Sequence, residues 1–102
     1  GIISKRSDAD WLRLIRSAAA DSNHVRLTLH ARRRMQQRRV SMREVLNVLR
    51  RGIFDEPPAP AVNPPGHWTA RLADRGEIAV VVGFDPEDRP IVLNVITVTR
   101  GR

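Results

Sequence analysis

Residues 30–39 form the stretch HARRRMQQRR, which holds one histidine and five arginines in ten positions. His30, Arg34 and Arg38 stand four positions apart, a spacing that aligns their side chains on one stripe of a helix. A neutral imidazole can accept a proton, and a guanidinium can stabilise the charge of a phosphorane. Histidine and arginine without a metal fit RNA cleavage, in which the 2′-hydroxyl attacks the adjacent phosphate. DNA lacks this hydroxyl, so the same residues suit it poorly.

The apolar residues of this expected helix define its orientation. Ala31 and Met35 form the stripe next to His30, and we expect them to face the core. The His30 stripe would then flank the buried edge, while the other polar side chains would face water. The outward set comprises Arg32, Arg33 and Gln36.

The protonation state of His30 follows from its place in the first turn. Both the positive end of the helix dipole and the nearby Arg34 disfavour the imidazolium, so we expect a neutral ring at pH 7. Plainer interpretations remain open. A histidine near a helix start can be a cap or a packing residue, and arginines beside a core edge can lay their aliphatic stems on it.

The basic charge belongs to one segment of the chain. The formal net charge is +7, and Lys5 is the only lysine among the 18 basic residues. Residues 24–52 hold nine arginines against one acid, Glu44, which is a local net charge of +8. Because the guanidinium is a planar fork, arginine favours bidentate contact with phosphate or carboxylate. The segment therefore indicates a nucleic acid or an acidic protein as partner, with a solvated helix face as the simpler alternative.

Several function classes are excluded by composition. The chain has no cysteine, so a disulfide framework, a cysteine-based zinc site and a thiol nucleophile are excluded. The three histidines lack metal-ligand spacing such as HExxH, and we expect neither a metal nor a cofactor. No stretch reaches the length of a membrane span, and no signal segment opens the sequence, so we expect no membrane association and a cytoplasmic location.

The elements that must position the arginine helix can be predicted along a single domain, 1–102. Ser7 and Ser41 begin capping boxes for a first and a third helix, and Thr28 can cap the arginine helix between them. This helical part covers residues 7–52, with Gly52 as its stop.

The second half of the chain predicts a sheet. Residues 53–66 contain five prolines and are expected to form an extended, proline-rich loop. From 67–99 the apolar period changes to two, which predicts three strands joined by short turns, an antiparallel meander. The strands are expected at 67–73, 77–84 and 91–99. The middle one, IAVVVGF, is apolar on both faces and should be central. The prediction is an α+β domain with helices packed on one face of the sheet.

The stretch HARRRMQQRRVSMREVLNVLRRG resembles the His-Ala-Arg-x-Arg-Met…Arg-x-[Val/Ile]-Ser…Val-Leu…Leu-x-x-Gly signature of a small bacterial family of domains of unknown function. That family is similar to the BrnT/RelE/MqsR group of toxins. The likeness extends through the acidic, proline-rich loop and the WTARL, IAVVVGF and VLNVITV strands, from about Asp10 to Val98. It implies a RelE/BrnT-like fold and a ribonuclease toxin that an antitoxin encoded next to it neutralises.

The resemblance also implies roles for particular residues. His30 is the expected general base or acid, and Arg34 and Arg38, with Arg71 from the first strand of the sheet, are expected to hold the phosphate. Further nucleic-acid contacts are expected from Arg32, Arg33, Arg39, His67 and Thr97, with Thr99 as an alternative to Thr97. The chain contains no tyrosine, so a tyrosine general acid is absent from the sheet.

Three residues of the predicted sheet each carry two interpretations. His67 could be the missing acid or a half-exposed structural residue. Trp68 could be a core aromatic or could stack on a base. Asn94 stands in an otherwise apolar strand, where an edge hydrogen bond is the plainer explanation.

Together these observations predict a metal-independent RNA endonuclease of the toxin type, with RNA and a cognate antitoxin as partners. The alternative is a non-catalytic module that uses the same arginines to bind RNA, DNA or an acidic antitoxin. In a third interpretation, the basic segment serves only to dock the neutralising partner.

Overall fold

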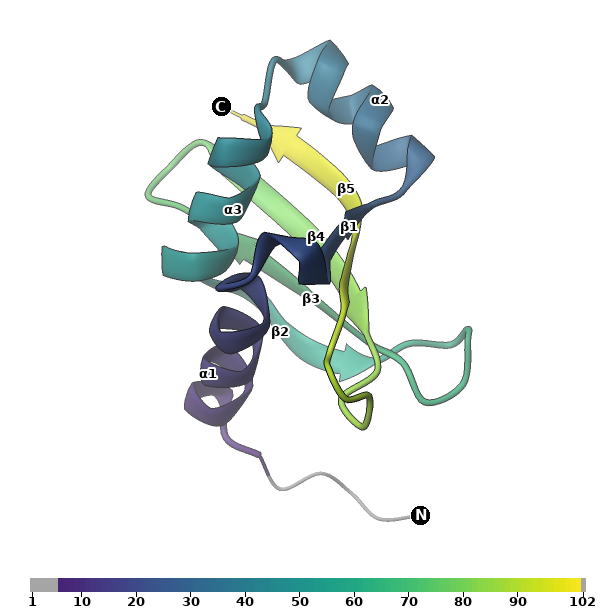
Figure 1. The fold of residues 1–102 in the computed structure, drawn as a ribbon. Coiled ribbons are helices and arrows are strands. Elements are labelled where there is room, and N and C mark those ends of the chain that lie inside the picture. The colour runs from purple at the N-terminus through teal and green to yellow at the C-terminus, as the bar shows by residue number, and fades with distance from the viewer. Residues whose placement is uncertain (1–5, 102) are drawn as a thin grey trace.

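The computed structural model describes residues 6–101, in which three α-helices accompany a five-stranded mixed sheet (Figure 1). In chain order the elements are α1 (Asp8–Ala19), a short 3₁₀ helix η1 (Ser22–His24), β1 (Val25–Leu27), α2 (Leu29–Arg38), α3 (Met42–Arg51), β2 (Ile53–Pro60), β3 (Trp68–Ala73), β4 (Ile78–Phe84) and β5 (Leu93–Arg100). The predicted α+β class is confirmed.

All three predicted helix starts are confirmed by their caps. Ser7 forms a complete capping box with Asp10, and Ser41 forms one with Glu44. The Thr28 hydroxyl accepts a hydrogen bond from an N–H group in the first turn of α2. These bonds satisfy backbone N–H groups that a helix start would otherwise leave without an acceptor. The capping residues Ser7, Thr28 and Ser41 therefore set where each helix begins.

The sheet has the strand order β1-β5-β4-β3-β2. The three predicted strands correspond to β3, β4 and β5, which pair antiparallel in sequence order. β4 lies in the middle, and six of its seven residues are buried, as its continuous apolar sequence predicts.

The proline-rich segment differs from the prediction of a loop. Its first part, Ile53–Pro60, is strand β2, which pairs antiparallel with β3, and only residues 61–67 connect the two strands. β2 is an edge strand, where a proline that lacks an N–H group is tolerated on the unpaired side. The pairing register shifts twice along β2, between Phe54 and Glu56 and between Glu56 and Ala59.

β1 adds a parallel pair to the expected meander. Val25–Leu27 pairs with Leu93–Val95 of β5, so the sheet is mixed rather than entirely antiparallel. Its partner β5 is the last strand of the fold, so the pairing joins segments that are distant in the sequence.

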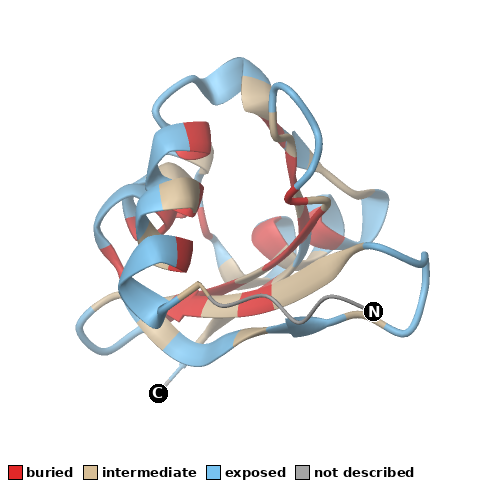
Figure 2. Cartoon of the chain, turned by 90° about the horizontal axis from the view of Figure 1, so that it is seen from below, coloured by how far each residue is buried: buried red, intermediate tan, exposed pale blue. Residues whose placement is uncertain are grey.

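The core lies between the helices and one face of the sheet. α1 and α3 lie side by side on this face, and α2 lies along β5 (Figure 1). Figure 2 shows the buried residues gathered on the facing sides of helices and sheet. Trp11 of α1 packs 4.7 Å from Trp68 and 5.9 Å from Phe84, measured between ring centroids. Trp68 is therefore a core aromatic, as the first of its two interpretations proposed.

The opposite face of the sheet carries mixed side chains. In β3, Ala70 and Leu72 are buried toward the helices, whereas Thr69 and Arg71 alternate onto the other face and are half-buried. Within the described chain, no helix is long and apolar enough to span a membrane.

Candidate nucleic-acid interface

α2 is attached to β5 at its first residues. The backbone N–H of Thr28 donates to the carbonyl oxygen of Val95 at 3.1 Å, and the Thr28 hydroxyl donates to the same oxygen at 2.9 Å. Ala31 and Met35 are buried in the common core. The rotation of α2 about its own axis is thus set by the residues that its sequence pattern indicated.

This rotation separates the arginines of α2 into two sets. Arg34 and Arg38 are half-buried beside the apolar stripe, as predicted, while His30 at the start of their stripe is exposed. The side chains predicted to face water are all exposed. They are Arg32, Arg33 and Gln36.

Arg34 is in contact with His30 and with Gln37 on this surface. Nε of Arg34 donates to Nε2 of His30 at 3.4 Å, and Nη1 of Arg34 donates to Oε1 of Gln37 at 3.1 Å. In this arrangement Nε2 of His30 is the acceptor, so the guanidinium of Arg34 lies against that ring nitrogen. Gln37 was not a predicted site residue. Its position three residues after Arg34 is the signal that could have found it.

The other two arginines expected to hold phosphate have partners of their own. Nη1 of Arg38 donates to the carbonyl oxygen of Val98, on the edge of β5 that α2 covers, at 3.3 Å. Nε of Arg71 lies 3.1 Å from Oδ2 of Asp55 in an ion pair. The geometry is not that of a hydrogen bond, so this buried Nε–H has no hydrogen-bond acceptor among the described residues. Each contact engages one nitrogen of the guanidinium group and restricts where its remaining donors can point.

Arg71 also lies away from the histidine. In the sheet, β4 and β5 lie between β3, which carries Arg71, and α2, which carries His30. In the described part of the chain, no hydrogen bond or ion pair joins Arg71 to α2. The structure therefore brings His30 and Arg34 together and leaves Arg71 in a separate place.

Thr97 and His67 occupy two further positions on or near the sheet. Thr97 pairs with Val81, which in turn pairs with Arg71, so Thr97 and Arg71 project from one row of the face that turns away from the helices. His67 lies before β3, and its backbone closes the preceding loop through bonds with Ala61 and Pro64. His67 is half-buried, and its backbone hydrogen bonds hold the loop, which supports the structural interpretation of this residue. Asn94 donates to the carbonyl oxygen of Gly83 at 3.4 Å, which is the expected hydrogen bond.

Six exposed arginines are distributed along β1, α2 and α3 and at the turn between the two helices. In the described chain, none of their side chains makes a hydrogen bond or an ion pair with another residue. They are Arg26, Arg32, Arg33, Arg39, Arg43 and Arg51. The single acid of this segment, Glu44, is bonded to Ser41 and to Arg100. These elements therefore carry a positive charge that no acidic side chain among the described residues compensates.

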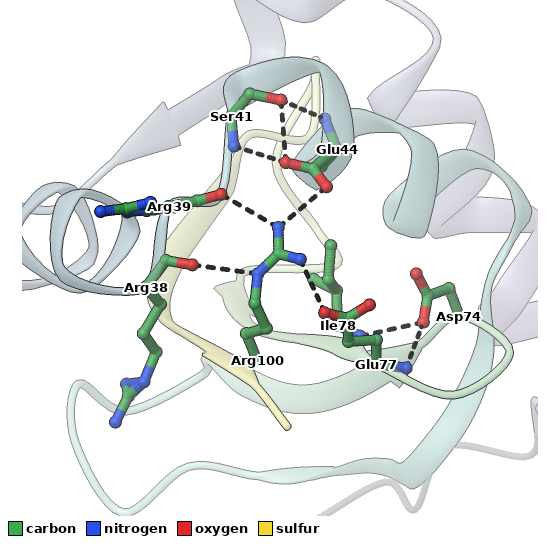
Figure 3. A network of polar contacts seen from close by, with 8 residues as sticks. All are labelled: Arg38, Arg39, Ser41, Glu44, Asp74, Glu77, Ile78 and Arg100. Atoms are coloured by element: carbon green, nitrogen blue, oxygen red, sulfur yellow. Dashed lines mark hydrogen bonds and ion pairs between the residues drawn. The ribbon is translucent and has the colours of Figure 1, made fainter. Parts of the chain in front are cut away.

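A network centred on Arg100 fixes the end of α2 (Figure 3). Nε of Arg100 donates to the carbonyl oxygen of Arg38 at 2.9 Å, and Nη2 donates to that of Arg39 at 2.9 Å and to Glu44 at 3.0 Å. Nη1 donates to Glu77 at 2.7 Å. The hydrogen bond with Glu77, followed by that with Glu44, raises the pKa of Arg100. The backbone N–H of Ser41 is the main cause of a lowered pKa at Glu44.

The network satisfies carbonyl groups at the C-terminus of α2 and ties that end to α3 and β4. Sequence reasoning missed Arg100, because nothing in its local pattern distinguishes it from a surface arginine. No group of three or more histidine and acidic side chains in the described residues could hold a metal ion.

The fold and this surface define a small α+β domain with an arginine-rich helix along β5, the strand next to edge strand β1 of a mixed sheet. The model of the family described as "Domain of unknown function (DUF4258)" matches residues 27–100, most of the chain, and the protein belongs to that family. No curated protein and no solved structure matched the chain. α1 precedes the matched region, yet its Trp11 and Ile15 are buried in the same core as β4 and β5.

Proposed function

We propose that this domain is a metal-independent RNA endonuclease of the toxin type, with His30 as the proton acceptor and Arg34 as the residue that holds the scissile phosphate. The observation that carries the proposal is the contact between Nε of Arg34 and Nε2 of His30, on a helix face whose other arginines have no carboxylate partner in the described chain. A base next to a cation is the minimum that phosphate transesterification requires.

The chemistry of the proposed reaction uses the nucleophile within the RNA. Nε2 of His30 takes the proton of the 2′-hydroxyl, and the resulting oxygen forms a bond to the adjacent phosphorus. The bond between phosphorus and the 5′-oxygen breaks, and this oxygen receives a proton from water. The products are a 2′,3′-cyclic phosphate and a 5′-hydroxyl, while Arg34 stabilises the charge on the non-bridging oxygens.

The surrounding arginines supply the binding step. Arg32, Arg33 and Arg39 are exposed on or next to α2, and Arg26 and Arg43 extend the same charge onto β1 and α3. Contacts of this kind follow the RNA backbone without reading its sequence, and they weaken as salt rises.

The test is cleavage of a single-stranded RNA in EDTA, analysed for the cyclic phosphate end. We expect His30→Gln to lower the cleavage rate by about 100-fold or more, the usual range for loss of a general base. His67→Gln is the matched control and should cleave at the parental rate. A 2′-deoxy oligonucleotide of the same sequence should remain intact. Parental activity in His30→Gln, with the fold verified by circular dichroism, would show that the site assignment is wrong.

A second candidate is a non-catalytic RNA-binding module. It is favoured by the partners of Arg38 and Arg71, which hold these two guanidinium groups away from His30. This candidate predicts RNA binding without cleavage. Removal of either Arg32 or Arg33 should then weaken binding, and should lower the slope of log K against log salt by about 0.7 per phosphate contact with a single strand.

The toxin assignment adds a protein partner to the proposal. A surface with six unpaired arginines in the described chain suits an acidic antitoxin as well as RNA. Expression in a bacterial host should arrest growth, and co-expression of the protein encoded next to it should relieve the arrest. Arrest that persists unchanged in His30→Gln would separate toxicity from RNA cleavage.

A further inference from the structure

Among the described residues, the side chain of Arg34 has two hydrogen-bond partners, and neither is a carboxylate. Its Nε donates to the imidazole of His30 at 3.4 Å, and its Nη1 donates to the side-chain amide of Gln37 at 3.1 Å. Arg38 of the same stripe likewise donates to a neutral group, the carbonyl oxygen of Val98, whereas Arg100 at the end of α2 contacts the carboxylate of Glu44. Arg34 is thus a guanidinium on a positive surface whose hydrogen bonds all go to uncharged acceptors.

The bond to His30 occupies the atom that the proposed reaction needs. Nε2 accepts from Arg34, so its lone pair points at the guanidinium and the ring proton resides on Nδ1. While this contact lasts, the lone pair cannot receive a proton from a 2′-hydroxyl. The same side chain that would hold the phosphate therefore covers the base.

We infer that Arg34 covers Nε2 of His30 in the free protein, and that an oxyanion bound by Arg34 draws the guanidinium away and exposes this nitrogen. The oxyanion is the phosphate group of the RNA substrate, and in naming RNA the inference rests on the proposed function. The covering of Nε2 by Arg34 does not depend on it.

The exchange of partners is favoured by charge. Hydrogen bonds between a guanidinium and a phosphate or sulfate are charge-assisted, bidentate and stronger than bonds to an amide or an imidazole. The surrounding exposed arginines attract an anion to the same place. His30 is exposed and Arg34 is half-buried, so the guanidinium can turn without displacing Ala31 or Met35 from the core.

The consequence is a fixed order of binding and proton transfer at one site. A phosphate is bound first, and only then does the base acquire a free lone pair next to it. Gln37 acts as a positioning residue in this scheme, because it holds the far side of the guanidinium while Nε contacts His30.

The experiment measures the ring nitrogens of the histidines by long-range proton–nitrogen NMR in the intact protein, at about pH 8 so that unperturbed imidazoles are neutral. The chain has three histidines, and the spectrum of His30→Gln identifies the His30 signals. Inorganic sulfate is the probe, because its charge does not change near this pH.

We expect His30 to be protonated on Nδ1 in the free protein, and we expect sulfate to shift its Nε2 resonance in a saturable manner while His67 stays unchanged. Arg34→Met, which removes the donor, should move the Nε2 resonance of His30 without sulfate and abolish the sulfate response. Arg75→Met, which removes an exposed arginine between β3 and β4, should keep the tautomer and the response.

Three results would overturn the inference: a proton on Nε2 of His30 in the free protein, a His30 spectrum in Arg34→Met identical to that of the parent, or an Nε2 resonance that sulfate leaves unmoved. Failure of the proposed function gives a different pattern. In that case the NMR results are as expected, but RNA is bound and not cleaved.

Discussion

The junction between α3 and β2 offers a sharp test of the fold. Gly52 follows the last residue of α3, donates its N–H to the carbonyl oxygen of Val48 at 2.7 Å, and accepts from Nη2 of Arg16 at 3.0 Å. A Cβ atom at this position would lie 2.5 Å from the carbonyl oxygen of Val48 and 2.7 Å from that of Ala73. Both oxygens belong to the backbone, so neither can rotate away. We predict that Gly52→Ala destabilises the protein for this steric reason alone.

The magnitude follows from the cost of overpacking. The backbone angle φ of Gly52 is −73°, which alanine adopts readily, so no conformational strain is added. Inserting a methyl group into a well-packed site costs about 1–3 kcal/mol, because the surrounding backbone must shift. For a domain near 100 residues, a loss of about 2 kcal/mol lowers the melting temperature by roughly 8–16 °C.

Thermal unfolding followed by circular dichroism measures this loss. Gly101→Ala is the matched control, since a Cβ there would meet no atom within 4 Å, and its free energy of unfolding should stay within about 0.5 kcal/mol of the parental value. A melting temperature of Gly52→Ala within about 2 °C of the parent would refute the reasoning, because so small a change corresponds to well under 1 kcal/mol.

Two further predictions concern polar contacts. Asp74 accepts hydrogen bonds from three backbone N–H groups, chiefly that of Glu77, and these bonds lower its pKa. The stability that the ionised Asp74 contributes is therefore fully present above the unfolded pKa of about 3.9, and it is lost as the pH falls through the lower folded pKa. Between pH 7 and pH 3, urea unfolding should show a smaller decrease in the free energy of unfolding for Asp74→Asn than for the parent, and an equal decrease would contradict this assignment. Arg100→Met should speed amide hydrogen exchange in the last turn of α2, which it leaves without its side-chain donors, whereas Arg75→Met should not. Unchanged exchange in Arg100→Met would show that the network does not hold α2.

The helices could be predicted from the sequence because their determinants are local. The hydroxyls of Ser7, Thr28 and Ser41 bond to N–H groups within three residues, and the apolar stripe of Ala31 and Met35 repeats with the helical period. These signals identify both the start of α2 and the side that faces the core.

The strands at the two edges of the sheet could not be predicted in the same way. β1 has three residues, and its pairing with Leu93–Val95 joins segments from the two ends of the fold. β2 contains three prolines, which local rules assign to a loop, and only the unpaired outer side of an edge strand makes them compatible with pairing. In both cases a distant strand decides the structure of the segment.

The candidate site shows the same limit. The four-residue spacing placed His30 and Arg34 in contact, because both lie on one helix. The partners of Arg38 and Arg71 are a β5 carbonyl and the Asp55 carboxylate, which only the tertiary fold brings near. Spacing within a helix therefore predicted a pair of residues, whereas a site composed from several elements required the fold.

The dependence of α2 on β5 has a consequence during protein synthesis. Thr28 and Arg38 bond to β5, and Arg100 of β5 bonds to the carbonyl groups that end α2. β5 is the last strand of the fold to leave the ribosome, and domains fold largely as units once their elements are available. The nascent chain thus carries its arginine helix without the strand that orients it. A newly made molecule would therefore orient the proposed RNA-cleaving surface only after β5 has left the ribosome.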